Sequence, residues 1–273
     1  MKKICLLLLI SHLASAQLYK PKPVTALLGA FADEVKLVEQ SLRKPRTETL
    51  NGIRFTTGTL NGRRVVVAQT GIGKTNAAMT TAFLLAHFRP EQVLFTGIAG
   101  GVNPALNPGD IVIARQIGYH DYHSIATSPD QAGAGLTIRT RSATTGELNP
   151  AYFPADSLLL LRALETAQSL SFDALPGQTK SPVVVAGTVV TGDEFVSSAE
   201  KVRALRAEHQ ADATEMEGAA VAQVCYQQRV PCLVIRSLSD KADDDARRDM
   251  MTFLRTAARN SARLVMALTG RLK

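Results

Sequence analysis

Apolar and polar residues follow two different periods along the chain from residue 24 onwards. Short runs rich in Val, Ile and Leu have the length and composition of buried strands, and they alternate with longer stretches that repeat apolar residues at helical spacing. This order predicts a mixed or parallel sheet flanked by helices. The predicted strands are Val24–Leu28, Ile53–Thr59, Val65–Thr70, Gln92–Thr96, Asp110–Ala114, Val183–Val190 and Cys232–Arg236, and the predicted helices are Ala32–Arg43, Lys74–His87, Ala155–Leu170, Ala199–Glu208, Gly218–Gln228 and Arg247–Leu268.

The connections between these elements divide into short turns and one long segment. Asn61-Gly62 lies between two predicted strands and is a typical hairpin sequence. By contrast, Gly118–Pro150 is rich in Ser, Thr, Gly and Ala with little periodicity, which predicts a long surface excursion of the kind that often forms a functional rim. Since no repeat or linker divides the chain, residues 17–273 are predicted to form a single domain.

The N-terminus has the pattern of an export signal. Lys2 and Lys3 precede the apolar run Ile4–Ile10, and small residues follow at 14–16. This predicts a secretory signal peptide over residues 1–16, because the run is much shorter than the ~20 residues of a membrane-spanning helix. We therefore expect an exported chain, periplasmic or secreted, with no membrane anchor after cleavage.

Charge and cysteine content narrow the function classes. The chain has 31 basic and 24 acidic residues, and loss of Lys2 and Lys3 leaves 29 basic residues and a net charge of +5. The excess is mild and scattered, so no nucleic-acid partner is predicted. Cys225 and Cys232 remain after signal cleavage, and both lie in apolar runs. Two buried free thiols are favoured, with a disulfide as the alternative.

Several short motifs do not hold up as ligand sites. GIGKT (71–75) lacks the first glycine of a phosphate loop, since that position is Ala68, and Asn76 replaces the third glycine of a dinucleotide fingerprint. The motif therefore predicts only a tight turn that starts a helix. His120, Asp121 and His123, like the aspartates at 243–245, have no partners at ligand spacing, so no metal is predicted.

Three acids lie where carboxylates are unusual. Glu34 and Asp240 each follow a predicted strand, and Glu217 starts a predicted helix, all at one edge of the sheet. Any one of them alone is explained as a helix cap. Together they indicate a binding site, because ligands of α/β sheets lie beyond the carboxyl ends of strands. TGIAGG (96–101) is predicted to be a glycine turn whose backbone, at Ile98, Ala99 and Gly100, walls this site.

Collinear motifs over residues 24–268 give the chain a specific resemblance. They are GAFADEVKLV (29–38), TGIGKTNAAMTTAFLL (70–85), TGIAGG (96–101), PGDIVIA (108–114), YHD (119–121), TGDEFV (191–196), TEMEGAAVAQVC (214–225) and VPCLVIRSLSDKAD (230–243). The chain thereby resembles the 5'-methylthioadenosine/S-adenosylhomocysteine nucleosidases of the nucleoside phosphorylase superfamily. The resemblance implies a three-layer α/β/α sandwich around a mixed, mostly parallel sheet, a homodimer, no cofactor or metal, and hydrolysis of the bond between adenine and ribose.

The resemblance also implies roles for individual residues. Asp240, oriented by Ser239, matches the acid that protonates purine N7, and Glu34 matches the base that activates water. Glu217 matches the acceptor of the ribose hydroxyls. These roles suit the chemistry, because breaking an N-glycosidic bond builds positive charge on the sugar and negative charge on the base. Of the remaining matches, Met216 packs along the sugar, Glu215 is a further acid of the motif, Phe195 stacks on adenine, and the backbone of Val196 reads the edge of the base.

Some departures from the family leave the 5' substituent of the substrate open. Family members commonly have a serine at Ile98, an aspartate and a small apolar residue at 123 and 124, and an aromatic residue at Met250.

Two alternatives to hydrolysis stay open. A purine nucleoside phosphorylase of the same fold needs cationic donors for phosphate near 30–32 and 95–98, and the chain has none there, so hydrolysis is favoured. A non-catalytic exported nucleoside-binding protein has little need for both Glu34 and Asp240.

Overall fold

The computed structural model describes residues 23–122 and 139–272. The predicted signal peptide and the middle of the Gly118–Pro150 excursion, including His123, lie outside these ranges.

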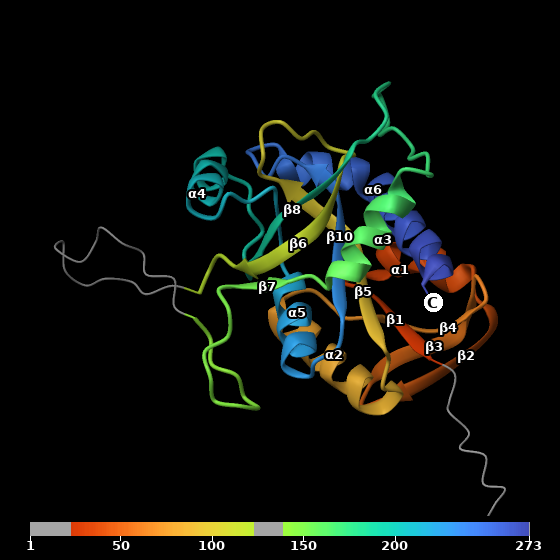
Figure 1. Ribbon diagram of the computed structural model, residues 1–273. Coiled ribbons are helices and arrows are strands. Elements are labelled where there is room, and N and C mark those ends of the chain that lie inside the picture. The colour runs from red at the N-terminus through yellow and green to blue at the C-terminus, as the bar shows by residue number, and fades with distance from the viewer. Residues whose placement is uncertain (1–22, 123–138, 273) are drawn as a thin grey trace, which may run out of the picture.

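All described strands belong to one mixed sheet in the order β10-β6-β8-β9-β5-β1-β4-β3-β2, with β7 paired to β6 (Figure 1). The strands are β1 (Val24–Gly29), β2 (Arg43–Leu50), β3 (Ile53–Leu60), β4 (Arg63–Gln69), β5 (Gln92–Gly101), β6 (Ile111–Tyr119), β7 (Tyr152–Pro154), β8 (Val184–Thr191), β9 (Ala213–Glu215) and β10 (Cys232–Asp240). The helices are α1 (Ala32–Gln40), α2 (Lys74–Phe88), α3 (Ser157–Ala167), α4 (Ala199–His209), α5 (Gly218–Gln227) and α6 (Ala246–Arg271).

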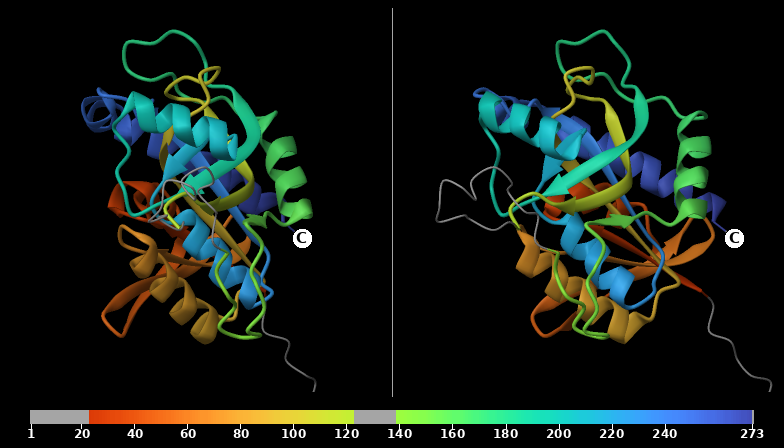
Figure 2. Two further views of the ribbon diagram at one scale, coloured as in Figure 1. Left: turned by 90° about the vertical axis from the view of Figure 1, so that its left-hand side faces the viewer. Right: turned by 60° about the vertical axis from the view of Figure 1, so that its left-hand side comes forward.

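Helices cover both faces of the sheet (Figures 1 and 2). On one face α1, α3 and α6 enclose a core that includes Leu27, Ile113 and Leu264. On the other face α2 and α5 enclose a core that includes Leu84 and Val221. The expected three-layer α/β/α sandwich around a mixed sheet is therefore confirmed. Within the described ranges, no helix is long and apolar enough to cross a membrane.

The centre of the sheet folds back on itself. β10 pairs in parallel with β5 and antiparallel with β6, while β8 and β9 connect β6 back to β5. As a result the end of β5 meets two strands at once, because Gly100 pairs with Asp240 of β10 and with Thr214 of β9. This closure brings segments more than 100 residues apart in sequence to one point of the sheet.

Three strands extend further than the apolar pattern predicts. The predicted turn at Thr96–Gly101 is wrong, since this segment continues β5. β10 continues past Arg236 to Asp240, and β6, which was predicted to end at Ala114, continues to Tyr119. Glycine and buried polar residues are uncommon inside strands. The apolar pattern therefore stops before the strands themselves end. Pairing of β5 with β10 continues to the Gly100–Asp240 pair, and the ladder holds both strands in place.

Three strands were not predicted at all. β2 has the sequence RKPRTETL and is almost entirely exposed at the edge of the sheet, so it lacks apolar alternation, and the helix predicted to reach Arg43 ends at Gln40 instead. Charged residues are a common device for protecting an edge strand from further pairing. β7 and β9 are only three residues long, and their place depends on partners distant in sequence.

The predicted hairpin is present, and its backbone needs glycine. Asn61 and Gly62 join β3 to β4 with φ angles of 48° and 83°, which is the left-handed region. A side chain at Gly62 has open space around it, so only backbone strain opposes a substitution there.

We predict that Gly62→Ala lowers the free energy of unfolding by about 1–2 kcal/mol, because alanine is strained in the left-handed region. Gly62→Asn is the matched control, since asparagine tolerates this conformation, and it should lose clearly less. Urea titration of both variants measures the difference. Equal losses in the two variants would mean that backbone strain is not the cause.

Candidate active site

One cavity of about 170 Å³ brings together all eleven predicted site residues. It lies where β5, β9 and β10 meet, beside the starts of α1 and α5. Its lining consists of Glu34, Ile98, Ala99, Gly100, Phe195, Val196, Glu215, Met216, Glu217, Ser239 and Asp240, together with Phe31, Ile72, Glu194, Thr214 and Met250.

Asp240 ends β10 and is only 3% exposed. The Ser239 hydroxyl donates a 2.6 Å hydrogen bond to Oδ2, and the Ala242 backbone N–H donates a 2.8 Å bond to Oδ1. Burial raises the pKa of Asp240 to about 6, although both hydrogen bonds favour the charged form. The carboxyl group is therefore held in a fixed orientation and keeps a proton at far higher pH than an exposed aspartate.

Glu34 lies in the first turn of α1, 2% exposed. Its Oε2 accepts hydrogen bonds from the backbone N–H groups of Ala30 and Phe31, which is the helix-capping role that its position alone suggests. Its Oε1 accepts a further bond of 2.9 Å from the Ile98 N–H in β5. Burial raises its pKa to about 7, against the opposing effects of Arg236 and these N–H groups. Glu34 therefore caps a helix and is poised to exchange a proton near neutral pH.

Glu217 precedes the first turn of α5 and is 6% exposed. The Gly73 backbone N–H, at the start of α2, donates a 2.7 Å hydrogen bond to its Oε1. Its Oε2 has no protein donor among the described residues, so this oxygen is free to accept from a ligand. Burial, and then the neighbouring charge of Glu215, raise the pKa of Glu217.

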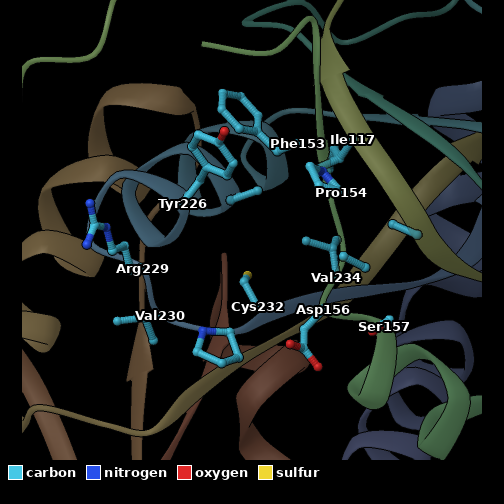
Figure 3. A pocket seen from close by; sticks show the side chains of 14 residues that line it. Ile117, Phe153, Pro154, Asp156, Ser157, Tyr226, Arg229, Val230, Cys232 and Val234 are labelled. Atoms are coloured by element: carbon cyan, nitrogen blue, oxygen red, sulfur yellow. The ribbon is translucent and has the colours of Figure 1, made fainter. Parts of the chain in front are cut away.

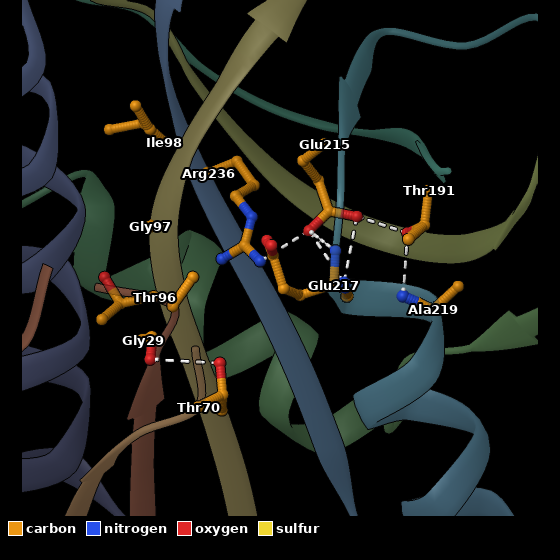
Figure 4. A network of polar contacts seen from close by, with 12 residues as sticks. Gly29, Thr70, Thr96, Gly97, Ile98, Thr191, Glu215, Glu217, Ala219 and Arg236 are labelled. Carbon is orange, nitrogen blue, oxygen red and sulfur yellow. Dashed lines mark hydrogen bonds and ion pairs between the residues drawn. The ribbon is translucent and has the colours of Figure 1, made fainter. Parts of the chain in front are cut away.

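Glu215 lines the cavity, but its carboxylate is bonded to groups of the protein (Figure 4). It forms a 2.7 Å ion pair with Arg236, whose side chain is 1% exposed. It also accepts bonds from the Thr191 hydroxyl and from the backbone N–H groups of Glu217 and Gly218. The acceptor sites of this carboxylate are occupied, so a role in contacting the substrate is not favoured. Glu215 instead fixes the backbone that carries Glu217.

Arg236 is the buried cation at the centre of the acid cluster, and the motif analysis did not single it out. Its guanidinium stacks on the Phe95 ring at 4.0 Å and donates to Glu215. Burial alone disfavours its charge, yet Glu215 and then Glu34 keep its pKa above the ordinary value. The signal was present in the sequence, because an arginine inside the apolar strand CLVIRSLSD requires a buried acid as partner.

The glycines of β5 make room for charged side chains. A Cβ at Gly97 would lie 2.5 Å from Glu34 Oε1 and 2.8 Å from Arg236 Nη1, and one at Gly100 would lie 2.9 Å from Asp240 Oδ1. Glycine was expected here so that the backbone could form a wall close to a ligand. In the structure, the groups that come close to these glycines are acidic side chains of the protein and Arg236.

A larger cavity of about 460 Å³ lies elsewhere, around Phe153 and Tyr226 (Figure 3). Its only carboxylate, Asp156, caps α3 through the Leu159 N–H, so it is not arranged for acid–base chemistry. Cys232 also lines this cavity, and Cys225 lies nearby in α5. Both are free thiols, as favoured from the sequence, but only Cys225 is buried, since Cys232 is half-buried. The hydrogen bond with Cys232 and burial raise the pKa of the Cys225 thiol.

Known proteins match almost the whole described chain. The model of the phosphorylase superfamily matches residues 24–269. A 5'-methylthioadenosine/S-adenosylhomocysteine nucleosidase of Bacillus thuringiensis is 36% identical over 250 residues, covering 91% of this chain and 99% of the relative.

Solved structures agree in fold. A Colwellia psychrerythraea 5'-methylthioadenosine/S-adenosylhomocysteine nucleosidase in complex with adenine has a TM-score of 0.76 at 34% identity, covering 92% of this chain and 96% of that one. A futalosine hydrolase of Helicobacter pylori has a TM-score of 0.77 at 29% identity, and the match covers 92% of this chain and 98% of that one. The chain belongs to the phosphorylase superfamily and, within it, to the group of the 5'-methylthioadenosine/S-adenosylhomocysteine nucleosidases.

Proposed function

We propose that the protein hydrolyses the N-glycosidic bond of adenine nucleosides, with 5'-methylthioadenosine and S-adenosylhomocysteine as the first candidates, and releases adenine and the ribose moiety. One observation carries this proposal. Asp240 and Glu34, two buried carboxyl groups with pKa values raised to about 6 and about 7, line one small cavity together with the half-free carboxylate of Glu217.

The geometry suggests a division of labour. Asp240 donates its proton to N7 of adenine, so that the bond between C1' and N9 breaks with its electron pair on a neutral base. Glu34 accepts a proton from the water that attacks C1'. Glu217 accepts hydrogen bonds from ribose hydroxyls, and these bonds strengthen as the sugar becomes cationic. Return of the proton from Glu34 to Asp240 through solvent completes the cycle.

Water is a better nucleophile for this cavity than phosphate. Within the described ranges, no lysine, arginine or histidine lines the cavity, and the nearby guanidinium of Arg236 is already paired with Glu215. A phosphate dianion needs cationic donors, whereas the ionised carboxylates of the lining would repel it. The phosphorylase alternative is therefore disfavoured. A purely binding role is disfavoured too, because raised pKa values mark acids whose charge the fold makes costly.

The lining of the cavity also includes apolar side chains. They belong to Phe31, Ile72, Ile98 and Met250, and they suit an uncharged methylthio group at the 5' position. Adenosine and futalosine are the comparison substrates, since a structural relative is named for futalosine hydrolysis.

We also propose that the mature chain acts outside the cytoplasm. The support is the signal peptide predicted for residues 1–16, which lies outside the described residues. Salvage of nucleosides from the surroundings would give such an enzyme its substrates.

We further propose a homodimer, supported by the surface of α2. This helix buries Ala77 and Leu84, yet it also exposes Met79, Ala82 and Ala86 on its other side. A helix that is apolar all round is typically covered on all sides, and a second copy offers the matching surface.

The dimer can be tested by light scattering after gel filtration. We expect twice the mass of one chain for the unaltered protein and a shift to one chain mass for Met79→Glu. Leu161→Glu is the matched control, because Leu161 is an equally exposed apolar residue on α3, away from α2. A monomer at micromolar concentration without any substitution would contradict the dimer.

Substitution of Asp240 tests the reaction itself. We expect Asp240→Asn to lower kcat/KM for adenine release by at least about 10²-fold, since the amide has no proton of suitable acidity to give to N7. Asp244→Asn, an exposed neighbour, should keep normal activity. The released base is measured by chromatography, with and without phosphate. It is adenine from 5'-methylthioadenosine, S-adenosylhomocysteine and adenosine, and hypoxanthine from inosine and futalosine. Strict dependence on phosphate would overturn hydrolysis, and no base release from any substrate would favour the binding role.

The two raised pKa values predict a pH profile. Glu34 must be ionised, and it gains a proton as the pH falls below about 7, whereas Asp240 must be protonated and loses its proton as the pH rises above about 6. We therefore expect a bell-shaped curve of kcat/KM with its maximum between these values. Initial rates from pH 4.5 to 9, with residual activity at pH 7 as a stability control, give the curve. Activity that stays level down to pH 5 would contradict the raised pKa of Glu34.

A further inference from the structure

We propose that Lys74 is a positioning residue that clamps the segment 192–196 and thereby sets the affinity for the nucleobase. The identity of the base as adenine rests on the proposed function. Lys74 is the lysine of the GIGKT turn, for which the sequence offered no role beyond starting a helix.

Lys74 contacts this segment twice. Its backbone N–H donates a 2.9 Å hydrogen bond to Asp193 Oδ1, and its Nζ lies 3.7 Å from Asp193 Oδ2. The same Nζ forms a 2.6 Å ion pair with Asp121 Oδ2, and this oxygen also accepts a 2.8 Å bond from the Asp193 N–H. Lys74, Asp121 and Asp193 therefore form a closed triangle that joins α2, the end of β6 and the segment 192–196.

The Lys74–Asp121 pair is more enclosed than an ordinary surface ion pair, whereas the side chain of Asp193 is 49% exposed. The side chains of Lys74 and Asp121 are only 23% and 13% exposed, and the lysine also lies over the Tyr119 ring at 5.5 Å. Burial opposes the charge of Asp121, yet the hydrogen bonds from Lys74 and from the Asp193 N–H hold its pKa below the usual value. Water screens an enclosed charge pair less than an exposed one. The Lys74–Asp121 pair therefore contributes more stabilisation than the small amount typical of an exposed pair.

The segment also contacts His120. The imidazole of His120 packs directly against Gly192, where any side chain would collide with the ring. The segment is thus in contact with a buried ring as well as with the Lys74 triangle.

This matters for the ligand because the next residues line the cavity. Glu194, Phe195 and Val196 face the site, whereas Lys74, Asp121 and Asp193 do not line it. Phe195 is 46% exposed, so the core does little to fix its ring. Its place depends on the backbone at Asp193, and an aromatic wall binds a planar base well only where it is held in advance.

Calorimetric titration with free adenine tests the proposal without requiring turnover. We expect Lys74→Met to weaken adenine binding about tenfold with unchanged stoichiometry, and Lys74→Arg to restore most of it. In kinetics, KM should rise while kcat changes by less than about threefold. A merely structural defect would instead reduce the number of binding sites and leave the Kd of the folded fraction unchanged. Should Lys74→Met fail to fold, Asp121→Asn, which removes charge with little change in shape, should weaken adenine binding in the same direction.

Lys201→Met is the matched control. Lys201 pairs with Glu194 of the same segment at 3.2 Å, but the two side chains are 35% and 52% exposed, which is more than those of Lys74 and Asp121. We expect it to bind adenine normally. An unchanged Kd in Lys74→Met, or an equal loss in Lys201→Met, would overturn the role of Lys74. Absence of adenine binding and of adenine release in the unaltered protein would instead overturn the proposed function, and with it this inference.

Discussion

The buried ion pair of Arg236 with Glu215 is the interaction on which the site depends. Glu34, Glu215 and Glu217 are all less than a tenth exposed, and Arg236 is the only cation that approaches all three within the described residues. Burying a carboxylate without compensation is strongly unfavourable, and removing one partner of a buried pair typically costs about 3–5 kcal/mol. The pair therefore does more than join β9 to β10, because it makes a cluster of acids tolerable at the centre of the molecule.

One guanidinium cannot neutralise three carboxylates, and the acids that it does not pair with therefore bind protons more tightly. Glu215 takes the guanidinium directly, while the pKa values of Glu34 and Glu217 rise because burial outweighs their share of its charge. A raised carboxyl pKa means that the folded chain holds the proton more tightly than the unfolded chain. The stability from these groups is thus fully present below their unfolded pKa of about 4.5 and declines as the pH rises towards the folded values. The fold gives up stability at neutral pH to keep acids that can exchange protons there.

An element or site residue could be predicted from the sequence where neighbouring residues determine it, and not where partners distant in the sequence determine it. Helices such as α2, α4 and α5 were located to within a residue or two, because the buried face of a helix requires apolar residues at regular spacing in the sequence. The strand β2 and the second half of β5 show no such pattern, since β2 is exposed at the edge of the sheet and both segments are held by pairing with neighbouring strands. Glu34, Glu217, Asp240 and the backbone at 98–100 were indicated by their positions at one edge of the predicted sheet, whereas the other site residues and the individual roles came from the resemblance to a family. Arg236 and Lys74 received no role in the site, because their importance lies in partners more than 20 residues away in the sequence.

The two acids of TEMEG show why spacing alone could not assign roles. Glu215 and Glu217 are two residues apart, but Glu215 ends a strand and Glu217 precedes a helix, so their carboxylates meet different donors. The first is saturated by Arg236, Thr191 and two backbone N–H groups, whereas the second receives only the Gly73 N–H. The second oxygen of Glu217 receives no hydrogen bond from the described residues, so it can accept one from a hydroxyl group that a ligand brings into the cavity. The unequal supply of donors within the protein is therefore what turns one of two neighbouring acids into a recognition group for a sugar.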